Sequence, residues 1–407
     1  MAIADQVTIS GTNFLISLAL ARFMVAAEYG LYVFGFTTLI ILEGLQNNLV
    51  SAPLNVIAAR KNRSEWRELV FHSLIFHVII SLLVIAALTT SFFLLRGTTY
   101  GGNAIVLLNL NITAVAFMGS ELLRKSFLSI LDIGNTLLLD IIAYSIRLLA
   151  LVAVFFLDLS SAVIVLHFIS LGSLTSILIG LRKIKLDLHL MKFKKPVMIE
   201  IFDYGKWTLL DWLPFVLSGQ LYVYIVTFVL GNEATGALGA IRNFVAPVSI
   251  LLVSLMNYVL PYFSGIYAKK GDQAFKANLG SFFVTISLIL LAYLAIINIF
   301  AEELLYLVYG KYSEFAFILL LLSFGIALNI FFKPFDIYLR VICKPKYIFL
   351  SRIGSAAVSL LLCYPLVFYY GLSGAALSYI LSQAGMLVML SFFTVKLGNF
   401  VSRKRSV

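Results

Sequence analysis

Residues 69–95 read LVFHSLIFHVIISLLVIAALTTSFFLL, an apolar run that sets the structural class of this chain. Its 27 residues include no Asp, Glu, Lys or Arg. As a helix the run would exceed the roughly 30 Å of a bilayer's hydrocarbon core. Hydrophobic residues make up 61% of the whole chain and charged residues 12%. A soluble domain cannot cover so much apolar surface, so the composition predicts a membrane protein.

Comparable apolar runs recur along the whole chain, and we count twelve predicted spans. Each is long enough to cross a bilayer as a helix. Two pairs of spans are separated only by the turn sequences Asp158-Leu-Ser-Ser and Gly371-Leu-Ser-Gly, which predicts tight helical hairpins. The predicted spans are 7–26, 31–53, 69–95, 103–123, 135–157, 161–181, 206–230, 237–261, 279–300, 312–333, 347–370 and 373–396.

The distribution of basic residues predicts the orientation of the chain. Lys and Arg gather in the connections after the second, fourth, sixth, eighth and tenth spans and in the C-terminal tail. Positive residues stay on the cytoplasmic side, so both termini are expected there. Attraction to anionic lipid headgroups then accounts for the net charge of +11, and no nucleic-acid partner is expected. We expect the connection after the fourth span to contain Arg124 and Lys125. We expect the connection after the tenth span to contain Lys333, Arg340, Lys344 and Lys346.

The longest predicted connection, residues 182–205, divides the spans into two sets of six. It is basic and amphipathic, which is typical of a segment that lies on a membrane surface. We expect an N-terminal six-helix bundle at 1–181, this linker, and a C-terminal six-helix bundle with a short basic tail at 206–407. Both halves place a proline before a basic pair, at Pro53 with Arg60-Lys61 and at Pro261 with Lys269-Lys270. Because six is even, the halves would form a parallel pseudo-repeat.

Several short motifs in the chain are informative: Ser10-Gly-Thr-Asn-Phe-Leu15, Ala21-Arg22-Phe23, Glu28-Tyr-Gly-Leu-Tyr32, Gln46-Asn-Asn-Leu-Val-Ser-Ala-Pro53, Glu121-Leu-Leu-Arg124-Lys125 and Gly371-Leu-Ser-Gly-Ala-Ala376. They resemble motifs of Wzx-like polysaccharide transporters. The resemblance implies membership of the superfamily of multidrug, oligosaccharidyl-lipid and polysaccharide (MOP) exporters. It implies an all-α, MATE-like bilobed transporter with a central cavity. The implied cargo is an oligosaccharide on a polyprenyl pyrophosphate, flipped from the cytoplasmic to the outer leaflet.

Charged residues inside the predicted spans are the candidate functional residues, because a charge at bilayer depth needs a partner or a function. Arginine suits a pyrophosphate headgroup, since its planar guanidinium bonds phosphate oxygens in pairs and keeps its charge. We therefore assign headgroup binding to Arg22, Arg242 and Arg147. The acids Glu43, Asp140 and Asp211 are candidates for coupling to H+ or Na+, or for pairing with a basic residue.

Each assignment has an alternative. The related flippase for the peptidoglycan precursor has an arginine, an acid and an arginine in its first, second and eighth helices, and Arg22, Glu43 and Arg242 are similar to these. Arg22 lies close enough to its helix end to reach the interface instead. Glu43 could pair with Arg22, and Asp211 with Lys206. Two pairs with i,i+4 spacing are expected to be structural: Glu121 with Lys125, and Asp336 with Arg340.

Three classes of function compete for this sequence. The cationic residues and the resemblance favour a lipid-linked oligosaccharide flippase in a bacterial or archaeal plasma (inner) membrane, surrounded by membrane lipids and working with a polysaccharide polymerase and its chain-length machinery. The alternative is a cation-coupled exporter of small organic cations or drugs, which would need an acidic binding region. An enzyme is not expected, because the outer connections are short and His72, His77, His167 and His189 are scattered. We expect no catalytic residues, no metal ligands and no cofactor.

Overall fold

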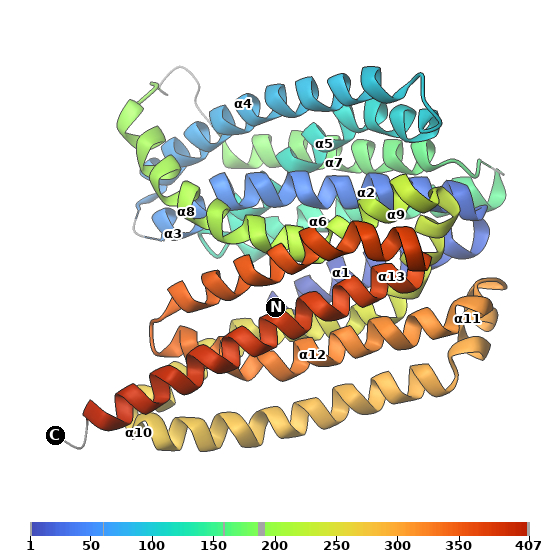
Figure 1. Cartoon of the computed structure of the whole chain (residues 1–407). Helices are drawn as coiled ribbons and strands as arrows, with labels where there is room; N and C mark the ends of the chain where they lie inside the picture. Colours follow the sequence, from blue (N-terminus) through green and yellow to red (C-terminus); the bar gives the residue numbers. More distant parts are fainter. Residues whose placement is uncertain (1, 60, 158, 186–191, 405–407) are drawn as a thin grey trace. The chain divides into compact units, whose positions relative to one another are not determined.

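The computed structural model describes the chain except for residues 1, 60, 158, 186–191 and 405–407. In the part that it describes, every regular element is a helix (Figure 1), which confirms the all-α fold. The elements are α1 (Ala2–Phe23), α2 (Ala26–Gln46), η1 (Asn47–Ser51), α3 (Ala52–Ala58), α4 (Arg63–Leu95), α5 (Gly101–Leu128), α6 (Ile133–Phe156), α7 (Ala162–Ile184), α8 (Lys195–Gly219), α9 (Leu221–Leu230), α10 (Asn232–Ile299), α11 (Ala301–Tyr309), η2 (Ser313–Phe315), α12 (Ala316–Val341) and α13 (Pro345–Lys404).

These helices are long and apolar enough to cross a membrane many times. Among the described residues, nine helical segments have the length and hydropathy of a span, and the bent pair α8 and α9 makes a tenth. A glycine with positive φ interrupts each of the two longest helices: Gly271 in α10 (φ 77°) and Gly371 in α13 (φ 59°). Glycine alone adopts this conformation at no steric cost, so the chain bends there. The predicted spans fall on these helices, and the protein is a multi-pass membrane protein.

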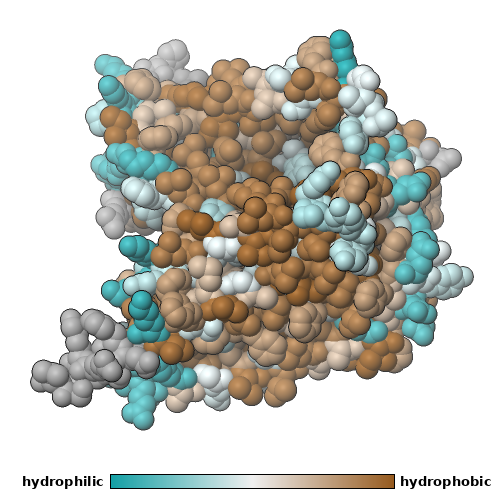
Figure 2. Space-filling view, viewed as in Figure 1, coloured by the Kyte–Doolittle hydropathy of each residue, from teal (hydrophilic) through white to brown (hydrophobic). Residues whose placement is uncertain are grey.

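The surface is one that lipid can solvate. Figure 2 shows hydrophobic residues over the sides of the helices and hydrophilic residues toward their ends. On α4, for example, Leu82 and Leu83 are 63% and 66% exposed. A soluble protein rarely leaves large apolar patches in water, whereas lipid tails contact them without cost.

The chain forms two compact units, unit 1 (Met1–Leu213) and unit 2 (Pro214–Val407). In unit 1 the ring of the fully buried Trp66 on α4 contacts that of Phe127 on α5. In unit 2 the ring of Phe275 on α10 stacks on that of Tyr338 on α12. The predicted linker at 182–205 and its flanking bundles stay predictions, because residues 186–191 of that linker lie outside the described part.

The Glu28-Tyr29 motif has a structural role in unit 1. Glu28, in the first turn of α2, accepts the backbone N–H of Ala162, the first residue of α7, at 2.9 Å. The hydroxyl groups of Tyr29 and Ser17 are 2.9 Å apart and link α2 to α1. A carboxylate at a helix N-terminus accepts a hydrogen bond from an otherwise unpaired N–H group and interacts favourably with the helix dipole. The motif therefore holds three helices of unit 1 together.

Two helices continue further than the sequence predicts. Helix α5 reaches Leu128 and α12 reaches Val341, so Arg124, Lys125, Lys333 and Arg340 lie within helices and not in connections. Arg124, Lys125 and Arg340 each bond a carboxylate. A paired charge is tolerated at greater depth than an isolated one, so an apolar helix need not end where such a residue occurs.

Candidate functional site

Helices α5 and α6 share a buried ion pair in unit 1. Arg124 donates its Nε–H to both carboxylate oxygens of Asp140, at 2.8 and 3.0 Å. Its Nη1 lies 3.7 Å from Oε2 of Glu121, one turn earlier on α5. Asp140 is only 4% exposed. A buried carboxylate held in this way balances the charge of its partner, and removing either group would leave a buried charge uncompensated.

Lys125, the next residue on α5, joins that helix to α2 and η1. Its Nζ lies 2.6 Å from Oε1 of Glu43 and 2.8 Å from Oδ1 of Asn47. Asn47 begins η1, a π-helical turn that ends at Ser51. Such turns are rare and occur frequently at functional sites. Here the turn places an amide oxygen beside a carboxylate, and both contact one ammonium group.

Arg147 on α6 is a buried arginine with neutral partners. Its Nη2 donates a hydrogen bond of 3.2 Å to Oγ of Ser173 on α7, and the residue is 3% exposed. Its Nε and Nη1 have no hydrogen-bond partner among the residues that the structure describes. The guanidinium carbon lies 4.5 Å from the ring centroid of Tyr144 and 5.0 Å from that of Phe117. Aromatic faces attract a cation but leave its N–H groups available for an anion.

Arg242 on α10 has a similar environment in unit 2. Its Nη2 donates a hydrogen bond of 3.2 Å to Oε1 of Gln220, the residue between α8 and α9. Its guanidinium carbon lies 5.3 Å from the ring centroid of Tyr222. The ring of Tyr222 in turn contacts that of Tyr379 on α13 at 5.7 Å. In the described part of unit 2, the contacts of Arg242 are therefore an amide and an aromatic ring.

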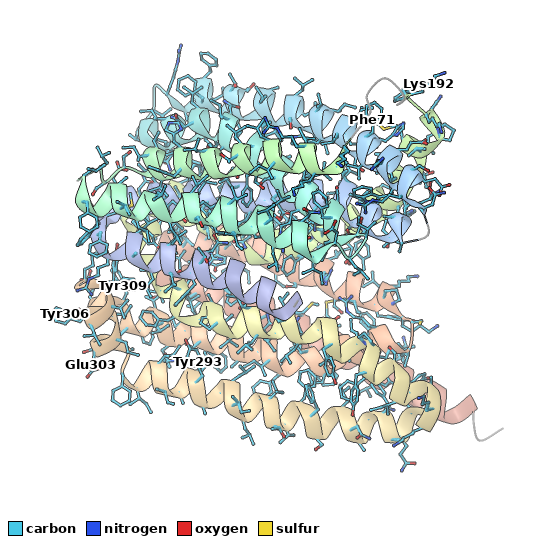
Figure 3. All side chains as sticks on the ribbon, turned by 180° about the vertical axis from the view of Figure 1, so that it is seen from behind. Phe71, Lys192, Tyr293, Glu303, Tyr306 and Tyr309 are labelled. Carbon is cyan, nitrogen blue, oxygen red and sulfur yellow. The ribbon has the colours of Figure 1, made fainter. Side chains whose placement is uncertain are left out.

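Two tyrosines hold the backbone on either side of Arg242. The hydroxyl of Tyr309 on α11 donates to the carbonyl of Ala240 at 3.1 Å. The hydroxyl of Tyr293, from the later part of α10, donates to the carbonyl of Phe244 at 2.7 Å. Figure 3 shows both tyrosines in unit 2, toward the end that carries α11. These bonds fix the segment from which the guanidinium extends.

The other predicted site residues are placed differently. Arg22 stands in the last turn of α1 with its side chain exposed. Glu43 pairs with Lys125 and not with Arg22, because α5 brings the ammonium group to 2.6 Å. Asp211 is partly buried on α8, and Lys206 pairs instead with Asp203, one turn away on the exposed side of that helix.

Of the two pairs expected to be structural, one is confirmed. Nε of Arg340 lies 2.9 Å from Oδ1 of Asp336. The pairing of Glu121 with Lys125 is wrong, since Glu121 faces Arg124 and Lys125 turns to α2.

Sequence reasoning misses the roles of Arg124 and Lys125 because the predicted fourth span ends at residue 123. The available signal was the presence of Glu121 close to two basic residues at the end of an apolar run. It also missed a buried contact between Gln46 and His77, in which Oε1 lies 2.6 Å from Nδ1. In the described part of the chain, no group of three or more His, Cys, Asp or Glu side chains is placed to hold a metal ion.

Comparison with known proteins identifies a family. The model of a family described as "Polysaccharide biosynthesis protein" matches residues 3–267, more than half of the chain, and this range includes both Arg147 and Arg242. The match confirms the resemblance that the motifs predict. No curated protein matches the chain in sequence.

Several solved structures share the fold over nearly the whole chain. One is the inward-facing conformation of a multidrug resistance MATE family transporter of the MOP superfamily, with a TM-score of 0.81, 13% identity, and coverage of 98% of this chain and 96% of the other. Another is the outward-facing conformation of such a transporter, with a TM-score of 0.68, 14% identity, and coverage of 96% and 92%. A third, from Pyrococcus furiosus, is described as a MOP superfamily transporter whose binding pocket has reverse polarity (TM-score 0.65, 14% identity, 98% and 94% covered). At these identities the likeness establishes a MATE-like fold.

Proposed function

The chain belongs to the polysaccharide biosynthesis protein family and has a MATE-like transporter fold, and from this premise we propose its cargo. The cargo is an oligosaccharide linked to a polyprenyl pyrophosphate. The protein moves it from the cytoplasmic to the outer leaflet by alternating access. The membrane is the plasma (inner) membrane of a bacterium or archaeon, with both termini in the cytoplasm, and a polysaccharide polymerase with its chain-length machinery uses the product.

The proposal depends on one observation: each unit contains an arginine on a membrane-spanning helix whose contacts, among the residues that the structure describes, are with neutral groups. Arg147 contacts a serine and two aromatic rings, and Arg242 contacts an amide and an aromatic ring. A charge at the centre of a bilayer costs about 2.5–3.5 kcal/mol, so a fold would not retain such residues for packing alone. A pyrophosphate that must cross the same apolar region supplies the opposite charge.

We assign headgroup binding to Arg147 and Arg242. The planar guanidinium group can donate two parallel hydrogen bonds to phosphate oxygens, and it stays protonated in an apolar environment. The stacked aromatic rings fix its orientation, so less side-chain entropy is lost when the headgroup binds. Arg22, exposed at the end of α1, is a third cation that the headgroup would meet near the membrane boundary.

The acids favour an anionic cargo over an organic cation. Glu43 is bonded to Lys125 and Asp140 to Arg124, so neither carboxylate is placed to bind a cationic drug. Glu43, Asp140 and Asp211 stay candidates for coupling to H+ or Na+. The first two would have to exchange a basic partner for the ion.

A flipping assay tests the proposal. The protein is reconstituted in proteoliposomes with a fluorescent polyprenyl-pyrophosphate oligosaccharide, and the fraction accessible from outside is followed over time. We compare Arg147→Gln, Arg242→Gln and their double variant with wild type. The matched control is Arg96→Gln, because Arg96 also stacks on an aromatic ring (4.7 Å from Phe93) but lies exposed at the end of α4.

We expect each of the two variants to flip about tenfold to a hundredfold more slowly, since a hydrogen bond to a charged group contributes roughly 1.5–3 kcal/mol. Arg96→Gln should flip at the wild-type rate. A correctly inserted double variant with wild-type flipping would refute the assignment of both arginines. Gradient-driven export of an organic cation, together with no flipping by the wild type, would instead favour the exporter alternative.

A further inference from the structure

A second basic group in unit 2 lies on α12, which packs against α10 and α13 (Figure 1). Lys333, Asp336 and Arg340 are spaced at i, i+3 and i+7 and so share one face of the helix. We call these three residues the α12 cluster. Neither of the two proposed headgroup-binding residues, Arg147 and Arg242, belongs to this cluster.

The charges of the α12 cluster do not balance. Asp336 is 3% exposed, and its Oδ1 lies 2.9 Å from Nε of Arg340, so this carboxylate already has a cationic partner. Lys333 is partly buried, and its ammonium group lies 5.6 Å from the ring centroid of Phe332. Two cations and one carboxylate leave one positive charge in excess. Arg352 of α13 adds repulsion, because Lys333 interacts electrostatically with it as well as with Arg340 and Asp336.

The depth of Lys333 suits a lipid headgroup. The residue lies eight positions before the end of α12, which corresponds to about 12 Å along the helix axis. The 26 residues of α12 span roughly 39 Å, which exceeds a hydrocarbon core of roughly 30 Å by several ångströms. If the excess length is shared between the two ends, the backbone of Lys333 lies about 8 Å inside the hydrocarbon region. A long lysine side chain can extend from this depth to the phosphate layer at the boundary. On the orientation predicted from the basic connections, this boundary is the cytoplasmic one.

We propose that the α12 cluster binds the phosphate group of a lipid at this boundary, with Lys333 as its principal ligand. A lysine ammonium binds phosphate as a point charge, and basic groups between membrane helices on the cytoplasmic side bind anionic headgroups. The phosphate would balance the positive charge of Lys333, because Asp336 already balances that of Arg340. Two sources share this chemistry, a phospholipid of the surrounding bilayer and the pyrophosphate of an arriving polyprenyl cargo. The site goes beyond the proposed function, since it would exist even if the transported cargo were another molecule.

Binding measurements on the full chain test this site and require no transport. The protein is placed in nanodiscs of phosphatidylcholine, and three probes are titrated separately: phosphatidylglycerol, polyprenyl pyrophosphate and inorganic pyrophosphate. Wild type is compared with Lys333→Gln and with Lys333→Arg, which keeps the charge. The matched control is Lys311→Gln, because Lys311 is another partly buried lysine beside an aromatic ring in unit 2 (5.2 Å from Tyr312).

We expect Lys333→Gln to weaken lipid binding about fivefold, since one juxtamembrane charge contributes about 1 kcal/mol. Lys333→Arg and Lys311→Gln should bind as wild type does. A larger loss of affinity for polyprenyl pyrophosphate than for phosphatidylglycerol in Lys333→Gln would identify cargo as the ligand of the cluster, and an equal or smaller loss would identify bilayer lipid. Equal affinity of wild type and Lys333→Gln for both lipids would overturn the proposal. Binding of inorganic pyrophosphate as tight as that of either lipid would overturn the assignment to a lipid. Loss of flipping in the Arg147 and Arg242 variants is a separate result and does not bear on this one.

Discussion

The ammonium group of Lys125 on α5 lies 2.6 Å from a carboxylate oxygen of Glu43 on α2, inside unit 1. Both side chains are largely buried, at 17% and 22% exposure. The contact joins two helices that are far apart in the sequence, and the same ammonium group also contacts Asn47, the first residue of the π-helical turn η1. It therefore ties the irregular part of the second span to the fourth.

A double-mutant cycle should show that this pair is a structural ion pair. We expect Glu43→Gln and Lys125→Met each to lower the free energy of unfolding by roughly 2–4 kcal/mol, because each leaves a charge without its partner. The double variant should lose less than the sum of the two. Thermal unfolding in detergent measures this. Additive losses would contradict the pairing, and so would a Glu43→Gln variant as stable as wild type.

Tyr144 should contribute to the site through its ring, because Arg147 stacks on it at 4.5 Å. We expect Tyr144→Leu to weaken binding of a polyprenyl pyrophosphate by up to about thirtyfold, since a desolvated cation–π contact contributes about 2 kcal/mol. Tyr144→Phe is the matched control, because it keeps the ring and loses only the hydroxyl that accepts a 3.4 Å hydrogen bond from Asn13. The measurement is a binding titration in nanodiscs. Equal affinities for the Leu and Phe variants would remove the ring from the site.

Gly205 should be required for the packing of α8 on η1. A Cβ atom at this position would collide with the backbone carbonyl of Leu49. We expect Gly205→Ala to lower stability by about 1–3 kcal/mol, the usual cost of overpacking. In contrast, a Cβ on Gly280 in α10 meets nothing within 4 Å, so Gly280→Ala should be neutral or stabilising. The thermal unfolding midpoints of the two variants test this prediction. A shift of the midpoint in the same direction for both variants would count against the close contact at Gly205.

The native cysteines offer a test of orientation. Cys343, between α12 and α13, is exposed, and Cys363 is buried. We expect a membrane-impermeant maleimide to label Cys343 in inside-out vesicles and not in right-side-out vesicles, because this connection is predicted to be cytoplasmic. In a Cys343→Ser background, Thr98→Cys, in the exposed connection between α4 and α5, should show the reverse pattern. Labelling of Cys343 by the impermeant maleimide in intact cells would contradict the predicted orientation.

The fold was accessible from the sequence, because each span is a local property of some twenty consecutive residues. The stretch 69–95 needs no distant partner to be recognised as a span, and the turn at Gly371 is marked by its own residue type. The ends of spans were less accessible. Helix α5 continues past Arg124 and Lys125 because Asp140 and Glu43 neutralise them, and those two acids are contributed by other helices.

The candidate site was accessible only in part. Arg147 and Arg242 stand out in the sequence as charged residues inside apolar runs, but so do Glu43 and Asp140, which prove to be paired. Whether such a residue has a charged or a neutral neighbour is decided by contacts with residues far along the chain, such as Ser173 for Arg147 and Gln220 for Arg242. The same limit applies to the acid Asp140. The residues near it on α6 do not reveal that its partner is Arg124, sixteen residues earlier on α5.

The sequence by itself determined that this protein is a multi-pass helical membrane protein and which family it resembles, since hydrophobicity and short motifs act along the chain. Tertiary structure alone decided which charges balance one another. It assigned Glu43 to Lys125 and Asp140 to Arg124, and it gave Arg147 aromatic and hydroxyl neighbours. The physical reason is range: an ion pair acts over a few ångströms in space, and helix packing sets which side chains come that close.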